Sequence, residues 1–349
     1  MCQSRLREGE APACVQACPN QAIRIRIVPV ESFTVGLNGD SLLPGTAPSR
    51  ITKPSTQFLN LRRIDHSDPV PANHDEVRPA HGHFPLVCML VLTQAAAGLL
   101  LFDFVARFLL PGIAAPGEWH AILAASFAVA GLVSATWHLG RPAQAWKSFL
   151  GWRKSWLSRE ILAFGPWAAF AIAYAALPFL PAENQILPDW APSVDALLVT
   201  AGTGAVLTGL LGVFCSVMVY VFTQRPFWSF RHTGTRFGLT LLAAGSCFVA
   251  PLLAVFAIAG KIGYERWIRD EKRSPFPESA RVINGPLKRI RQKRVFHGVV
   301  AAGFLLASIW LPFLAVPGFV NVILAELQAR KLYFQAVKEP GMPGGIVAP

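Results

Sequence analysis

The chain has 349 residues, of which 53% are hydrophobic and 15% are charged, and its formal net charge is +12. Soluble proteins carry about 25% charged residues, so this composition excludes an ordinary soluble protein. A soluble protein this basic would suggest nucleic acid as a partner, but here the lysines and arginines lie in loops beside long apolar runs. That pattern excludes nucleic acid and indicates a membrane protein whose basic loops contact lipid headgroups.

Three of the six cysteines lie in the first 28 residues, at Cys2, Cys14 and Cys18, and Pro19 follows the last of them. Closely spaced thiolates on a short loop, with a proline after the final cysteine, are typical of iron–sulfur ligation. We therefore predict a ferredoxin-like segment over residues 1–28, with these three thiolates as candidate metal ligands. Three thiolates complete no set of clusters, which leaves a truncated start, a fusion remnant, solvent-facing thiols or a partner that supplies the missing ligands.

Residues 29–82 are polar and rich in proline, without helical or strand periodicity, and this pattern predicts an extended linker. Apolar runs near the roughly 20 residues that cross a bilayer then fill residues 83–336, before a C-terminal tail over 337–349. The sequence predicts an all-α polytopic membrane protein, a helical bundle of seven to eight spans. Six spans are clear and the last is weak: 84–109, 119–138, 160–180, 194–223, 237–260, 297–315 and 319–335.

Basic residues fall unevenly on the two sides of this predicted bundle. Loops 139–159 and 224–236 contain lysine and arginine, whereas loops 110–118 and 181–193 contain neither. The positive-inside rule therefore predicts that the N-terminal segment and the basic loops are cytoplasmic. The strongly basic stretch 261–294 does not fit, because five spans before it place it on the opposite side. Either a further span is hidden near residues 240–270, or this stretch forms an amphipathic surface helix or two.

The corner between the second and third spans combines an imidazole with a carboxylate. Thr136-Trp-His-Leu-Gly-Arg-Pro142 ends the second span, and Glu160 opens the third, so His138 and Glu160 belong to the same membrane face. These groups suit a proton-coupled redox site for a lipid-soluble carrier. The alternatives are that His138 caps its helix by donating to a carbonyl, and that the macrodipole favours Glu160 at a helix N-terminus without any function.

A haem is not expected, because a bis-histidine site needs two histidines at matched depth on different helices. His120 and His138 lie at opposite ends of one span, whereas His232 and His297 lie in loops or at a span edge. Tyr220 and Trp228 are predicted to be interfacial anchors rather than contacts of a carrier.

The chain resembles the membrane anchor subunit of dimethyl sulfoxide reductase. The residues that carry the resemblance are His81-Gly-His-Phe-Pro-Leu86, His138-Leu-Gly-Arg-Pro142, Ser155-Trp-Leu-Ser-Arg-Glu160, Met218-Val-Tyr220, Pro226-Phe-Trp228, and Ala325-Glu326 through Arg330 to Tyr333-Phe334. The N-terminal piece resembles the last cysteine group of the four-cluster iron–sulfur subunit, through Arg5-Leu6 and Gly9-Glu-Ala-Pro-Ala-Cys14.

The resemblance implies a bacterial inner-membrane subunit without haem that oxidises menaquinol and passes electrons to an iron–sulfur subunit and a molybdopterin catalytic subunit. It implies that His138 and Glu160 bind quinol, and the chemistry agrees. An imidazole accepts a proton from a quinol hydroxyl, and a nearby carboxylate passes the proton to water. Arg141 is expected to hold a quinone oxygen or to orient Glu160.

Two other functions stay open at this point. The chain could be a structural tether without its own quinone site. The cysteine group is incomplete, and the predicted bundle looks shortened relative to the anchor subunits that the chain resembles. It could also be an ion-translocating subunit of the polysulfide reductase group. That function needs buried ionisable residues across the bundle, and Asp103 and Asp195 are the candidates in or near spans.

Overall fold

The computed structural model describes residues 3–18, 23–25, 29, 70–71, 77–110, 117–137, 142–180, 193–338 and 343–345. The chain divides into two compact units, the first made of Met1–Asp75 with Pro340–Pro349, and the second of Glu76–Glu339. The first unit contains two short helices, α1 (Gln3–Arg7) and α2 (Ala13–Gln16), and an antiparallel pair of short strands, β1 (Val70–Pro71) and β2 (Pro343–Gly345).

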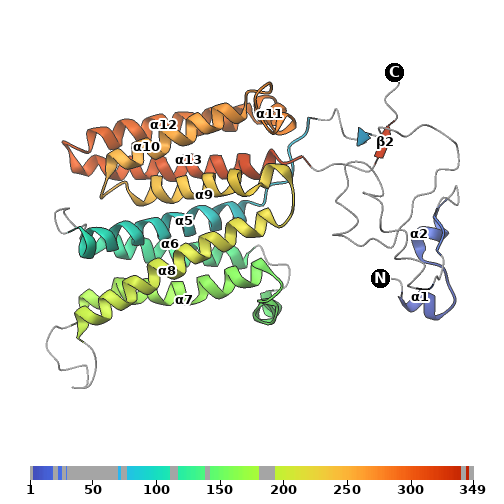
Figure 1. The fold of residues 1–349 in the computed structure, drawn as a ribbon, viewed down its shortest axis with the longest axis horizontal. Helices are drawn as coiled ribbons and strands as arrows, with labels where there is room; N and C mark the ends of the chain where they lie inside the picture. The colour runs from blue at the N-terminus through green and yellow to red at the C-terminus, as the bar shows by residue number, and fades with distance from the viewer. Residues whose placement is uncertain are drawn as a thin grey trace. The chain divides into compact units, whose positions relative to one another are not determined.

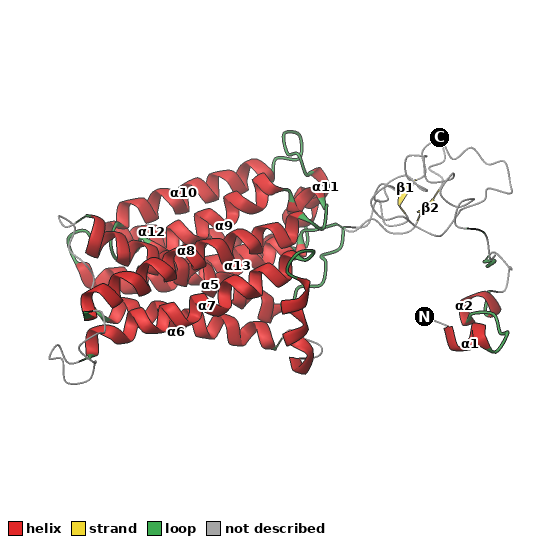
Figure 2. Ribbon diagram, turned by 60° about the horizontal axis from the view of Figure 1, so that its bottom comes forward, coloured by secondary structure: helices red, strands yellow, loops and turns green. Residues whose placement is uncertain are grey.

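The second unit is a bundle of long helices that run side by side along one axis (Figures 1 and 2). Its helices are α5 (Phe84–Phe104), α6 (Trp119–Thr136), α7 (Trp156–Ala176), α8 (Val194–Val221), α9 (Phe230–Gly245), α10 (Pro251–Ile268), α11 (Pro277–Asn284), α12 (Lys288–Ala307) and α13 (Ala315–Gln335). A π-helical turn (Val105–Leu109) extends α5, and 3-10 turns lie at Pro142–Gly151, Leu177–Phe179, Pro226–Trp228 and Pro312–Leu314.

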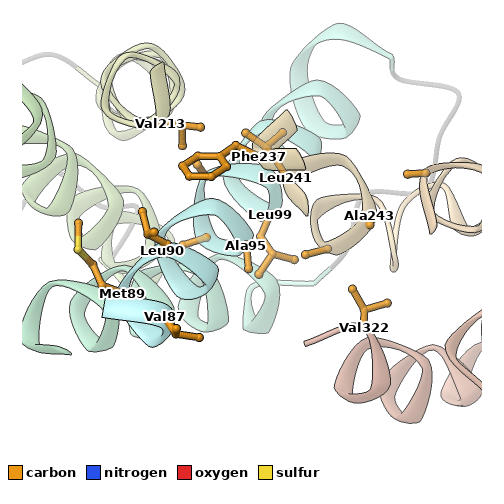
Figure 3. Close-up of a cluster of buried hydrophobic side chains, with 14 of the residues drawn as sticks. Val87, Met89, Leu90, Ala95, Leu99, Val213, Phe237, Leu241, Ala243 and Val322 are labelled. Atoms are coloured by element: carbon orange, nitrogen blue, oxygen red, sulfur yellow. The ribbon is translucent and has the colours of Figure 1, made fainter. Parts of the chain in front are cut away.

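Helix α5 lies at the centre of this unit. It contacts α6 and α8 on one side and α9 and α13 on the other. Helices α5–α8 form one half of the bundle, and α9, α10, α12 and α13 form the other half. Figure 3 shows the core where the halves meet, with Leu90 and Leu99 of α5 between Val213 of α8, Phe237 of α9 and Val322 of α13.

The structure confirms an all-α polytopic membrane protein. Within its described part, five helical segments are long and apolar enough to cross a bilayer, and the number of spans stays a prediction. The five segments are Phe84–Leu109, Trp119–Thr136, Trp156–Phe179, Val194–Val221 and Pro312–Gln335.

The predicted fifth span, 237–260, which Pro251 interrupts in the sequence, is divided between two helices in the structure. The chain reverses between Gly245 and Pro251, so this apolar run contributes to α9 and α10, which pack against each other. Proline is favoured in the first turn of a helix, because its missing N–H needs no partner there. The apolar composition of residues 237–260 did not reveal the reversal, because the loop between α9 and α10 is itself mostly apolar.

Two alternatives were open for residues 261–294, and the structure favours the first, because a further helix, α10, lies within residues 240–270. The stretch contains the end of α10, the short helix α11 and the start of α12, and the side chains of Lys261 and Arg294 are buried. Because α10 is a further crossing of the bundle, the basic residues that follow it lie at the same end as the 3-10 turn Pro142–Gly151. This end is called the basic end below.

The connecting segments 110–118, 181–193, 246–250 and 308–314 contain no lysine or arginine, although Arg107 lies in the π-helical turn just before the first of them. The extra crossing therefore removes the conflict in the charge pattern that the sequence alone could not resolve. Under the positive-inside rule all these loops now agree on one orientation, and which side of the membrane the basic end faces stays a prediction.

The glycine face of α8 makes a close contact with α7. A Cβ atom at Gly209 would lie 2.6 Å from Nε1 of Trp167, and one at Gly204 would lie 2.8 Å from the ring of Phe170. Glycine thus lets the two helices approach until aromatic side chains of α7 touch the backbone of α8. This approach fixes the distance between Glu160 on α7 and its partners on α8.

Gly98 of α5 and Gly245 of α9 make an equally close contact between the two halves of the bundle. A Cβ atom at Gly98 would overlap the carbonyl oxygen of Leu241 and lie 3.0 Å from the Cα of Gly245. We expect Gly98→Ala to lower the free energy of unfolding by about 1–3 kcal/mol, because the helices must separate. Thermal unfolding in detergent measures the change. The control is Gly260→Ala on α10, where a Cβ meets nothing within 4 Å. Equal unfolding temperatures for both variants would contradict the packing argument.

Candidate functional site

The carboxylate of Glu160 is buried at the basic end of the bundle. Helix α7 begins at Trp156, after Ser155 accepts a hydrogen bond from the backbone N–H of Ser158. Glu160 therefore lies one turn inside the helix rather than at its first residue, and its side chain is 4% exposed. Ser216 Oγ of α8 donates a hydrogen bond to the Glu160 carboxylate.

No ion pair to Glu160 forms within the described part of the chain, although arginine is abundant nearby. Arg159, the preceding residue, turns away and stacks on Trp156, with 4.3 Å between its guanidinium carbon and the ring centroid. It also donates to the carbonyl oxygens of Trp152 and Arg153, at 2.8 and 2.9 Å. Arg159 thus holds the loop before α7 in place, and no cation among the described residues pairs with the Glu160 carboxylate.

An aromatic cluster adjoins this carboxylate along α8. Tyr220 lies one turn after Ser216, and its ring centroid is 5.2 Å from that of Trp228 and 5.6 Å from that of Tyr333. Trp228 and Tyr333 are stacked at 5.8 Å. The prediction that Tyr220 and Trp228 are interfacial anchors is wrong, because both side chains are less than 10% exposed. The ring of Tyr220 instead packs inside the bundle, also against Phe237 and Phe334.

Arg330 of α13 is buried beside this cluster. Its Nη2 donates to Gln94 Oε1 of α5 at 2.6 Å, and its guanidinium carbon lies 3.8 Å from the ring centroid of Phe237. The Nε and Nη1 atoms of Arg330 have no hydrogen-bond partner in the described structure. Cation–π contacts with the rings of Phe237 and Tyr333 compensate in part for the missing hydrogen bonds.

A network of buried ion pairs occupies the half of the bundle formed by α9, α10, α12 and α13. Lys261 Nζ bonds to the carboxylate of Glu326, to Thr240 Oγ1 at 2.7 Å and to the carbonyl oxygen of Arg236 at 3.1 Å. Arg294 lies 3.6 Å from Glu326. Sequence analysis missed this network as a unit. The available signal was the pair Glu326 and Arg330, four residues apart on an apolar helix, which requires buried partners.

A second polar cluster lies at the end of the bundle opposite the basic end. Asp103 of α5 accepts hydrogen bonds from Tyr174 Oη at 2.6 Å and from Arg107 Nε at 2.8 Å, and its Oδ1 lies 3.1 Å from His120 Nδ1. Asp103 is therefore fixed by three neighbours. Asp195, the other predicted candidate for ion transport, is exposed in the first turn of α8. The structure does not bring these two carboxylates together in one path.

Several predicted site residues fall outside the described residues. They are Cys2, His138 and Arg141, so the structure tests none of their assigned roles. The described chain on either side of His138 ends α6 and begins the 3-10 turn Pro142–Gly151, at the end of the bundle that also holds Glu160.

The N-terminal cysteines that are described do not form a metal site by themselves. Cys14 is exposed in α2, and Cys18 follows that helix. No group of three or more His, Cys, Asp or Glu side chains that could hold a metal ion occurs in the described ranges. An iron–sulfur cluster therefore does not fit the residues in view, and ligation by Cys2, Cys14 and Cys18 stays a prediction that needs further ligands.

Comparison with known proteins supplies the family. The family model of the DMSO reductase anchor subunit (DmsC) matches residues 80–262, which include α5–α9, most of α10, Glu160 and Ser216. The chain belongs to this anchor family. A relative, one of the sulfite dehydrogenase subunits of Allochromatium vinosum, is 28% identical over 193 residues, which cover 50% of this chain and 58% of that protein. The chain thus matches little more than half the length of this relative. As a member of this family, it is a multi-pass membrane protein.

Proposed function

We propose that this anchor subunit oxidises menaquinol at the corner between α6 and α7, at the basic end of the bundle. The observation that carries the proposal is the buried Glu160 carboxylate, which is held by Ser216 and forms no ion pair in the described structure. A carboxylate whose charge no cation fixes is able to take up and release protons. Menaquinol loses two protons with its two electrons, so its oxidation needs such a group within reach.

His138 and Arg141 complete the proposed site. His138 accepts the proton of a quinol hydroxyl as a neutral imidazole, and Glu160 relays protons towards water at the basic end. Arg141 holds the second quinone oxygen or orients Glu160. Their neighbours in sequence support this placement, because α6 ends at Thr136 at the same end of the bundle at which α7 begins.

The electrons leave to partner subunits. Membership in the anchor family supports an iron–sulfur electron-transfer subunit and a molybdopterin catalytic subunit as those partners. The charge asymmetry of the loops supports a bacterial inner membrane with the basic end in the cytoplasm. The proposed complex reduces its terminal acceptor in anaerobic respiration at the molybdopterin subunit and not in this chain.

The opposite direction of electron flow is a second candidate. The relative from Allochromatium vinosum is named for a sulfite dehydrogenase, an enzyme that removes electrons from its substrate. In a complex of that kind the same site would reduce a quinone and take up two protons. The same residues would act in both directions. Stopped-flow absorbance of the reconstituted complex, with menaquinol and with menaquinone, distinguishes the two directions of electron flow.

The proposed site predicts stoichiometric binding of a hydroxyquinoline quinol analogue to the purified full-length chain. Quenching of analogue fluorescence measures the affinity. We expect His138→Ala to weaken binding by about tenfold or more, because one hydrogen bond to the analogue is lost in a desolvated site. His297→Ala is the control, because His297 bonds to Asn321 in the other half of the bundle. Absence of binding by folded wild-type chain would favour a purely structural tether.

A further inference from the structure

A small cavity of about 20 Å³ lies at the basic end of the bundle, in the half that does not contain Glu160. Residues of α9, α10, α11, α12 and α13 line it, and its polar wall consists of Arg236, Arg269, Arg291 and Glu265. A buried water needs at least about 10–15 Å³ measured in this way. One oxygen atom of a small polar group therefore fits inside without any movement of the protein.

The charges around this cavity do not balance. Glu265 uses one carboxylate oxygen for Arg236, at 3.4 Å, and the other for Arg294, also at 3.4 Å. Within the described structure, no ion pair contains Arg269 or Arg291. Their contacts are neutral: Arg269 Nε donates to the carbonyl oxygen of Glu265 at 3.3 Å, and Arg291 Nη1 donates to Asn284 Oδ1 at 2.7 Å. Two guanidinium groups thus line the cavity without an ion pair of their own in the described structure.

The fold holds these two like charges together. Asn284, the last residue of α11, donates from Nδ2 to the carbonyl oxygen of Arg269 at 3.0 Å while it accepts from Arg291. Partial burial, followed by the neighbouring charge of Arg291, lowers the pKa of Arg269, and Glu265 opposes this shift only in part. An anion between the two arginines would relieve the repulsion and take up their free N–H donors.

The geometry points to the phosphate group of an anionic phospholipid as the ligand of Arg269 and Arg291. A guanidinium group matches two phosphate oxygens at once, and basic pockets between helices at the cytoplasmic face bind lipid headgroups. Trp267, two residues before Arg269, is 46% exposed at the end of α10, which suits the headgroup layer of the bilayer. The cavity admits one phosphate oxygen.

Native mass spectrometry of the delipidated full-length chain tests this assignment. Phosphatidylglycerol is added to the wild type, to Arg291→Gln and to the control Arg289→Gln, which changes an exposed residue on the same helix. We expect one retained phosphatidylglycerol in the wild type, a fall of about tenfold in its affinity for Arg291→Gln, and no change for the control. Arg291→Lys should keep part of the affinity, because lysine retains the charge without the planar fork.

Further arms identify the source of the phosphate. Equal retention of phosphatidylcholine, or equal loss in the control variant, would overturn the site as non-specific lipid binding. If inorganic phosphate alone raises the unfolding temperature of the wild type as much as the lipid does, a free phosphate site replaces the lipid site. Binding seen only when the partner subunits are present would assign the arginines to that interface. Circular dichroism establishes folding, and Arg269→Gln serves as a second variant if Arg291→Gln fails to fold.

Discussion

Glu160→Gln is expected to lower the quinol-dependent turnover of the assembled complex by about 10²–10⁴-fold, the usual effect of removing a general acid–base group. The glutamine amide keeps the size of the side chain and can still accept a hydrogen bond from Ser216 Oγ. It cannot take up or release a proton in the working range. The measurement is the rate of menaquinol oxidation by the complex in lipid, followed by absorbance.

Two comparisons separate the loss of a proton acceptor from a structural effect. Asp195→Asn removes an exposed carboxylate from α8 and should leave turnover unchanged. Ser216→Ala removes the hydrogen bond to Glu160 but keeps the carboxylate, and a partial loss of turnover is expected. Wild-type turnover in Glu160→Gln, in a complex of normal composition, would remove Glu160 from the mechanism.

Glu326→Gln is expected to destabilise the bundle by about 3–5 kcal/mol, because it leaves the buried charge of Lys261 without its partner. The buried Arg294 lies 3.6 Å from the same carboxylate, so its positive charge would also lose part of its neutralisation. Chemical unfolding in detergent, followed by tryptophan fluorescence, measures the difference from the wild type.

The paired variant Lys261→Met/Glu326→Leu should recover much of this loss, since replacing both charges leaves no uncompensated ion in the core. Asp270→Ala is the exposed control. The ion pair of Asp270 with Arg273 spans 3.7 Å at the protein surface, and its removal should change stability by less than about 0.5 kcal/mol. A Glu326→Gln variant as stable as this control would show that the network contributes nothing to the fold.

The candidate site was predictable from the sequence in one part. Glu160 and the glycines of α8 are recognisable locally, because a carboxylate at the start of an apolar run and small residues at helical spacing are properties of single segments. The partners of Glu160 were not predictable. Ser216 lies 56 residues away and Tyr220 was assigned to the membrane interface, because a sequence does not show which faces of two helices meet.

The sequence by itself determined the class of protein, the anchor family and the asymmetry of charge between the loops, since composition and local motifs carry these properties. Tertiary structure decided what lies inside the bundle. The reversal between α9 and α10 turns one apparent span into two helices and moves the basic residues after it to the other end. It also brings Lys261 to Glu326, 65 residues apart in the chain. The charge pattern of the sequence places Lys261 on the surface, but its side chain is buried. Its counterion Glu326 is distant in the sequence, so the pair forms only when the helices pack.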